Sequence, residues 1–113
     1  MDERLFSMEA DFLKALGHPT RVRILEHLRA GEKCVCEFTE DLDMEQSNTS
    51  QHLAVLRKQG ILSFRKEGLK VIYKVNHPEV FTILDLVKDV LVSQVNASMA
   101  MLKKSTREKG GEQ

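Results

Sequence analysis

The stretch of sequence that decides the fold is residues 44–60, MEQSNTSQHLAVLRKQG. Its second half places Leu53 and Leu56 on one face of a helix that Gly60 ends. Its first half, residues 46–52, is a run of amide, hydroxyl and imidazole side chains, whereas a solvated helix face usually carries Glu and Lys. Such groups donate and accept hydrogen bonds, as reading base edges and phosphates requires. The stretch is typical of a DNA recognition helix; the alternative is a cap-rich helix on a solvated surface.

The segments on both sides of this stretch complete a DNA-binding motif. Residues 34–42 predict a short helix, and three linker residues, 43–45, join it to the recognition helix. Two helices joined so closely, the second rich in polar side chains, are typical of a helix-turn-helix. Beyond Gly60 the pattern changes to two β-rich runs within residues 61–75 that flank Gly68. A basic hairpin beside a helix-turn-helix predicts a wing that lies against the DNA backbone or minor groove.

Three further helices are predicted outside the motif. Residues 4–17 carry an apolar stripe at helical spacing, Pro19 opens a second helix, and residues 80–102 form a last helix. The apolar residues of the last helix cover more than one narrow stripe, so it needs cover on more than one side. In a chain this small, a second copy of the protein is the simplest cover. The predicted dimer face consists of Leu5, Phe12, Leu84, Val87, Leu91 and Val95.

Length and composition predict one globular domain. The chain has 113 residues, of which 42% are hydrophobic and 30% are charged. The prediction is a mainly α fold with a small β-hairpin: a winged helix-turn-helix of about five helices and a two-stranded wing, residues 1–105, followed by a disordered tail, residues 106–113. No apolar run approaches the ~18 residues that span a membrane, and no signal peptide is recognisable. Two cysteines two residues apart favour reduced thiols and a cytoplasmic protein.

Charge is unevenly distributed although the formal net charge is zero. Residues 26–45 carry seven acidic and two basic side chains, whereas residues 54–75 carry six basic and one acidic. The basic segment directly follows the polar run, which favours nucleic acid as the partner. The predicted DNA contacts are Gln46, Ser47, Asn48, Ser50, Gln51, His52, Arg57, Arg65, Lys66 and Lys70.

Two other classes of protein fit less well. The chain has no nucleotide-binding loop and no arrangement of nucleophile and base, so we expect that it is not an enzyme. A protein-interaction module would explain the apolar last helix. It would not explain a polar run placed next to a basic segment.

Four motifs together resemble the ArsR/SmtB family of bacterial winged-helix repressors. They are ALGHPTRVRIL at 15–25, EKCVCEF at 32–38, QSNTSQHL at 46–53 and GILSFRKEG at 60–68. The resemblance implies a homodimer that binds an inverted-repeat operator in double-stranded DNA and leaves it on a chemical signal.

The second motif resembles the family's metal box and makes Cys34 and Cys36 the predicted metal ligands. Thiolates are soft ligands that suit As(III), Sb(III), Cd(II) and Pb(II), with Zn(II) as a further candidate inducer. The family's metalloid site has a third cysteine three residues later, where this chain has Thr39. We therefore expect the third ligand to come from a small thiol, a water or a carboxylate such as Glu37. The last helix has Asp85 and Asp89 but no histidine, which argues against the family's zinc or nickel site there.

Helix geometry limits how the two thiols can act. If both belong to a regular helix, residues i and i+2 point ~200° apart, so chelation of one ion would require an irregular or unwound first turn. This predicts that a captured ion distorts the helix that supports the recognition helix. The alternatives are a sensor of thiol oxidation and a protein without a metal response, in which the cysteines are small, partly buried apolar residues.

Overall fold

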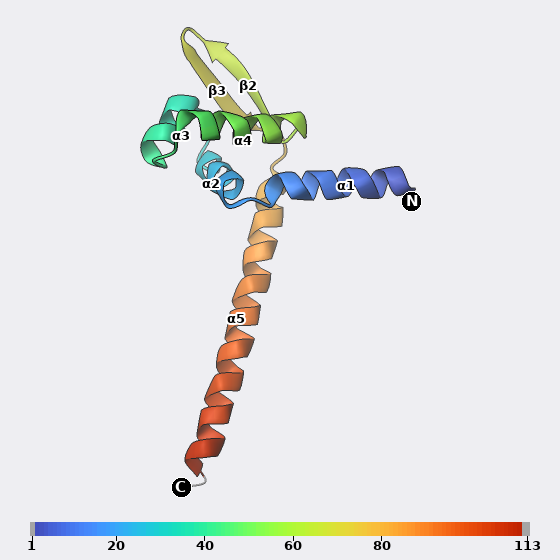
Figure 1. Ribbon diagram of the computed structural model, residues 1–113, viewed down its shortest axis with the longest axis vertical. Coiled ribbons are helices and arrows are strands. Elements are labelled where there is room, and N and C mark those ends of the chain that lie inside the picture. The colour runs from blue at the N-terminus through green and yellow to red at the C-terminus, as the bar shows by residue number, and fades with distance from the viewer. Residues whose placement is uncertain (1, 112–113) are drawn as a thin grey trace. The chain divides into compact units, whose positions relative to one another are not determined.

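The computed structural model describes residues 2–111, with side chains up to residue 106. The helices are α1 (Glu3–Leu16), α2 (Pro19–Leu28), α3 (Val35–Asp41), α4 (Gln46–Lys58) and α5 (Glu79–Gly111), and the strands are β1 (Lys33–Cys34), β2 (Leu62–Glu67) and β3 (Lys70–Val75) (Figure 1). This order confirms the predicted winged helix-turn-helix with five helices. The chain forms two compact units, residues 1–81 and 82–113, which are described separately. The predicted domain 1–105 and tail 106–113 stay predictions; residues 112–113 lie outside the described residues.

The predicted two-stranded wing is present, and a third, short strand extends it to a sheet of three strands. Strands β2 and β3 form the expected antiparallel hairpin, with Gly68 at φ 61° in its turn. Strand β1 pairs with the other edge of β3, where Cys34 lies opposite Ile72. A strand of two residues is too short to leave a periodic pattern in the sequence, which is why it was not predicted. Its consequence is that the first cysteine belongs to the sheet of the wing.

The core of the first unit is built around α4. Leu53 and Leu56 are fully buried, as their spacing predicts, together with Phe38 of α3 and Ile24 of α2. Thr49 is buried one turn earlier, and its hydroxyl donates to the Glu45 carbonyl at 2.9 Å. Burial of this side fixes the rotation of α4 about its axis, so the other amide and hydroxyl side chains of the first turns face solvent.

Helix α2 begins as its sequence predicts. Pro19 occupies the first turn, and His18 is the N-cap, its Nδ1 accepting from the Thr20 amide at 3.1 Å. Helix α1 ends at Gly17, also as predicted. The short connection places the end of α1 and the start of α2 next to each other in sequence and beside α4, with which both helices make contact.

The second unit consists of α5 from Thr82 onward. The helix continues to Gly111, beyond the predicted end at Leu102. Every described side chain from residue 85 to residue 106 is exposed. The large apolar side chains among them are Leu86, Val87, Val90, Leu91, Val92, Val95, Met99, Met101 and Leu102. Among the described residues, no helix combines the length and apolarity needed to cross a bilayer.

Candidate nucleic-acid interface and thiol site

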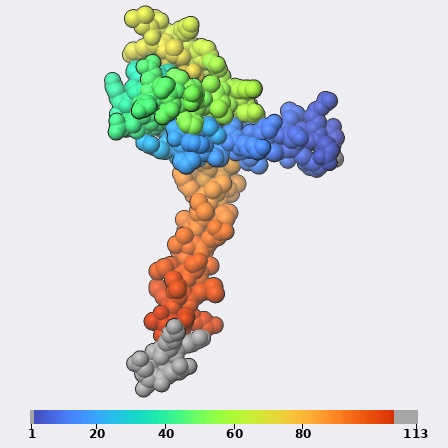
Figure 2. Space-filling model, in the orientation of Figure 1, coloured from blue at the N-terminus to red at the C-terminus, as the bar shows by residue number. Residues whose placement is uncertain are grey.

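The front of α4 presents hydrogen-bonding side chains to solvent. Gln46, Ser47, Asn48, Ser50 and Gln51 are all exposed, as expected of predicted DNA contacts. The N-cap residue of α4 makes no side-chain cap, so the first amide N–H groups of the helix are available to a phosphate oxygen. Figure 2 shows the hairpin, in yellow, protruding beyond the green helices α3 and α4. Helix and hairpin therefore offer a polar face and a projecting arm to one elongated partner.

His52 occupies a different environment from the other predicted contacts of α4. It is half-buried, its Nδ1 lies 3.1 Å from Arg21 Nη1, and its ring centroid lies 4.4 Å from that of His18. Arg21 also donates from Nη2 to the Lys14 carbonyl at 3.0 Å. The cluster joins the end of α1 and the start of α2 to the recognition helix. Contact of His52 with DNA stays a prediction, and its Nδ1 is already engaged.

Burial lowers the pKa of His52 from its ordinary value of 6.5, and the neighbouring His18 and Arg21 lower it further. The guanidinium of Arg21 does so because its positive charge lies next to an imidazole that would itself become positive on protonation. The cluster is therefore built for a neutral His52.

The basic side chains of the wing differ in their partners. Arg65 Nη1 lies 2.6 Å from Glu32 Oε2, and Arg65 Nη2 lies 3.4 Å from Glu67 Oε1. The hydrogen bond to Glu32 raises the pKa of Arg65. Two carboxylates thus share the charge of Arg65, whereas Lys66 and Lys70, on either side of the turn, are exposed. At the base of the hairpin, Arg57 contacts an aromatic ring instead of a carboxylate.

Arg57 connects the end of α4 to the base of the wing. Its guanidinium carbon lies 5.1 Å from the centroid of the Phe64 ring on β2. A guanidinium over an aromatic face is held by cation–π attraction while its N–H groups stay available at the rim. The predicted contact Arg57 is therefore oriented by the wing itself.

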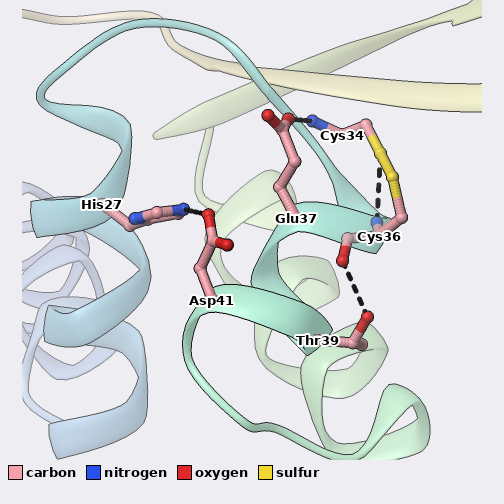
Figure 3. Close-up of a disulfide and its surroundings, with 6 residues drawn as sticks. All are labelled: His27, Cys34, Cys36, Glu37, Thr39 and Asp41. Carbon is pink, nitrogen blue, oxygen red and sulfur yellow. Dashed lines mark hydrogen bonds and ion pairs between the residues drawn. A yellow bond between two sulfur atoms is a disulfide. The ribbon is translucent and has the colours of Figure 1, made fainter.

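Cys34 lies before α3 and not within it, which corrects the sequence analysis. It is the extended N-cap residue, with φ −81° and ψ 157°, and its side chain is only 6% exposed. The Cys34 amide donates to Glu37 Oε2 at 2.6 Å, and the Cys36 amide donates to Cys34 Sγ at 3.1 Å (Figure 3). Cysteine is not among the preferred N-cap residues, so no local sequence pattern indicates this cap. Glu37, a predicted third ligand, is engaged in this capping box.

The two sulfurs are joined in a disulfide (Figure 3). Reduced thiols were predicted, whereas the structure has the two cysteines bonded to each other. The condition predicted for joint action of the two sulfurs, a first turn that is irregular or unwound, is met at Cys34, whose extended backbone precedes an intact α3.

A hollow of about 450 Å³ lies beside the cysteines. Its wall includes Cys34, Cys36 and Thr39, Gln46 and Ser50 of α4, and Leu69, Lys70 and Tyr73 of the wing. Thr39 donates from its hydroxyl to the Cys36 carbonyl at 2.9 Å (Figure 3). The structure thus places the sulfurs and three predicted DNA contacts around one space, a juxtaposition that local sequence patterns could not supply.

A second hollow, of about 490 Å³, also adjoins Cys34, Cys36 and Lys70. Carboxylates dominate its wall: Glu32, Glu37, Glu40 and Glu67. Within the part of the chain that the structure describes, no three His, Cys, Asp or Glu side chains form a group that could hold a metal ion. Metal binding by Cys34 and Cys36 therefore stays a prediction.

Comparison with known proteins agrees with this architecture. A family model described as "Bacterial regulatory protein, arsR family" matches residues 18–63. The uncharacterized HTH-type transcriptional regulator Rv0081 of Mycobacterium tuberculosis is 37% identical over 101 residues, which cover 88% of this chain and 89% of the relative. Its crystal structure aligns with a TM-score of 0.78 over 87% of this chain and 99% of that one, at 35% identity.

Two further relatives have more specific names. The arsenic resistance transcriptional regulator ArsR1 of Pseudomonas putida is 48% identical over 68 residues, 59% of this chain and 52% of the relative. The structure of HlyU from Vibrio cholerae aligns with a TM-score of 0.69 at 34% identity, over 79% of this chain and 97% of that one.

The His18–Arg21–His52 cluster predicts a loss of stability in mild acid. Because the pKa of His52 is lowered in the folded protein, the unfolded chain binds more protons as the pH falls. The stability contributed by neutral His52 is thus complete above pH 6.5 and is lost as the pH falls through 6.5 toward the folded-state pKa. Urea unfolding at pH 7.5 and 5.5 measures the loss. His52→Gln should lose less stability between these two pH values than the unmodified protein does. His77→Gln, which replaces a histidine in an exposed turn, should lose as much as the unmodified protein. Equal losses in all three would contradict the assignment.

Proposed function

The chain belongs to the arsR family of bacterial regulatory proteins, and from that premise we propose that it is a homodimeric repressor whose release from an inverted-repeat operator is controlled at Cys34 and Cys36. The family consists of DNA-binding transcription regulators and not of enzymes. The observation that carries the proposal is the hollow shared by the two sulfurs, by Gln46 and Ser50 of α4 and by Lys70 of the wing.

The DNA interface is proposed from the exposed front of α4 and the hairpin. Burial of Leu53 and Leu56 sets α4 so that its amide and hydroxyl side chains face outward into a major groove. The uncapped helix start suits a phosphate, and Lys66 and Lys70 suit the backbone next to the groove. Arg65 contributes less free charge than its position in the wing predicts, because Glu32 and Glu67 hold it.

The homodimer is proposed from apolar surface that a monomer would leave in water. Leu91 and Val95 on α5 are 54% and 60% exposed, and Leu5 and Met8 on α1 are exposed as well. Exposed apolar side chains that recur along a helix in this way mark an association site. Of the predicted dimer residues, Phe12 is half-buried and Leu84 is buried in the single chain, so Leu5, Val87, Leu91 and Val95 carry the proposal. A symmetric pair would present two copies of α4 to half-sites about 34–36 Å apart.

The proposed signal is a soft metal or metalloid bound by the reduced cysteines. As(III) or Sb(III) leads, followed by Cd(II), Pb(II) and Zn(II), because soft ions prefer thiolates. The placement of both sulfurs at the start of an intact α3 supports this proposal, as does the relative named for arsenic resistance. Glu37 is committed to the Cys34 amide, which leaves a small thiol, a water or another carboxylate of the second hollow, such as Glu40, as the third ligand.

A second candidate signal is oxidation of the thiols, and the disulfide between Cys34 and Cys36 favours it. In that case the reduced and oxidised forms would differ in affinity for the operator. The two signals share one site and differ in the reagent that causes release.

Substitutions on α4 and the wing test the DNA interface. Gln51→Ala should weaken operator binding by about 1–3 kcal/mol and relax base preference, because a base-reading amide is lost. Lys70→Ala should weaken all sequences alike and lower the salt slope by about one, because a phosphate contact is lost. Fluorescence anisotropy against operator and scrambled duplexes, at several salt concentrations, measures both effects. Unchanged affinity and preference in Gln51→Ala would refute the reading face.

A charge on α5 tests the dimer. Leu91→Asp should abolish both the dimer and operator binding, because an unpaired carboxylate cannot be buried in an apolar interface. Ser93→Asp is the matched control, since it adds the same charge to another exposed position of α5 and should leave both intact. Light scattering after size exclusion reports the mass. A Leu91→Asp monomer with normal affinity for the full operator would contradict the proposal.

Two variants test the sensor. Cys34→Ser combined with Cys36→Ser should bind the operator and lose the response to arsenite or oxidant. Thr39→Cys should bind arsenite more tightly and be released at lower arsenite, because it adds a sulfur to the wall of the hollow where Cys36 lies. Coupling of about 1–3 kcal/mol predicts graded release. Operator anisotropy during titration measures release, and a double-serine protein that still responds would show that the thiols are not the sensor.

A further inference from the structure

The two bonded sulfurs are not equally accessible. Cys34 is buried, held between its strand pair with Ile72 and its position as the cap of α3. Cys36, in the first turn of α3, is exposed. Thiol–disulfide exchange requires the incoming sulfur to reach one of the two bonded sulfurs, so access alone directs attack to Cys36.

The hydrogen bonds of the site favour the same direction of exchange. When a thiolate attacks Cys36, the sulfur that leaves is Cys34 Sγ. That sulfur already accepts the Cys36 amide N–H at 3.1 Å. A hydrogen bond from a backbone amide stabilises a thiolate more than a neutral sulfur, so it makes Cys34 the better leaving group.

The hollow beside Cys36 has the size and charge to hold an incoming molecule. Its volume of about 450 Å³ is within the ~300–1,000 Å³ range of small-molecule sites. Thr39, Gln46 and Ser50 supply hydrogen-bonding groups, and Lys70 is the one charged side chain among the described residues that line it. A small molecule that carries a carboxylate therefore finds both a cation and a cysteine in the wall of the hollow.

We infer that the hollow is a thiolation site, in which a small carboxylate-bearing thiol becomes attached to Cys36 with its carboxylate beside Lys70. The inference rests on the proposed function and names its ligand class. The incoming thiol gives its proton to solvent, and its thiolate attacks Cys36 Sγ. The Cys34–Cys36 bond breaks as the new bond forms, and Cys34 leaves as a thiolate with the electron pair. One disulfide replaces another, so no external oxidant or reductant is consumed.

The attached molecule would act directly on DNA binding. It would fill a space whose wall includes Gln46, Ser50 and Lys70, all of which are predicted DNA contacts. Its carboxylate would neutralise Lys70 and bring negative charge toward the phosphates. Modification should therefore weaken binding as removal of the Lys70 charge does.

Mass mapping tests the chemistry without DNA. The oxidised full-length protein is treated with 3-mercaptopropionate, neutral 2-mercaptoethanol or cationic cysteamine at equal thiolate concentration, then alkylated with iodoacetamide and digested. The expected product has the probe on Cys36 and the alkyl group on Cys34. The carboxylate probe should react about fivefold faster than the neutral one. Lys70→Gln should lose this preference, and Lys74→Gln, on the same strand but outside the hollow, should keep it.

A trapped adduct covers the case in which the internal disulfide closes again too quickly. Cys34→Ser is treated with dithiodipropionate, the symmetric disulfide of the same probe, so that Cys36 retains the adduct; Cys36→Ser is the matched control and should acquire none. An adduct on Cys34, equal rates for all probes in the unmodified protein, or no trapped adduct on Cys36 would overturn the inference.

Operator binding by the trapped adduct tests the consequence. Compared with unmodified Cys34→Ser, the adduct should lower the salt slope of operator binding by about one. In the Cys34→Ser/Lys70→Gln double variant, the adduct should leave the salt slope unchanged. An unchanged salt slope in the Cys34→Ser adduct would show that the attached molecule does not compete with DNA for Lys70. If unmodified Cys34→Ser and the unmodified protein both bind no DNA, the proposed function fails, while the mass mapping still decides the thiolation site.

Discussion

The pairing of Cys34 with Ile72 is the constraint on which the rest of the molecule depends. It fixes one residue in three roles, because Cys34 is at once the end of a strand, the cap of α3 and one half of the sulfur pair. Strand β3, to which it is paired, is also the inner strand of the wing, and α3 contacts α4. A chemical change at this sulfur therefore acts on the supports of both DNA-contacting elements.

The opposite charges of the two central segments meet within the protein. The acidic segment contributes Glu32, and the basic segment contributes Arg65, and the two side chains are paired across the sheet. An exposed pair of this kind adds little to stability, because solvent screens both charges. Its effect is to hold β2 of the wing to the loop before Cys34 and to take one cation out of the set offered to phosphates. Net charge along the sequence thus overstates the attraction of the wing for DNA.

The sequence could predict those features that depend on neighbouring residues. Leu53 and Leu56 orient α4, Pro19 starts α2, and Gly68 marks the hairpin turn, because each acts through local geometry. The missed features are contacts between distant residues or depend on an uncommon cap. His52 meets Arg21 across 31 positions, and Arg65 meets Glu32 across 33. Strand β1 exists only because β3 is there to receive it, so no pattern in two residues could have predicted it.

The shared hollow also determines how strongly a signal can act on DNA binding. Since both cysteines and three of the predicted DNA contacts line one space, an occupant would compete with the operator for Gln46, Ser50 and Lys70. Coupling between two ligands is reciprocal, so an occupant that weakens operator binding by some factor is itself bound more weakly, by the same factor, when the operator is present. Protein bound to its operator would then be shielded from the signal, and free protein would respond first. Direct competition of this kind needs no unwinding of α3, which agrees with a cap that already places both cysteines in the wall of the hollow.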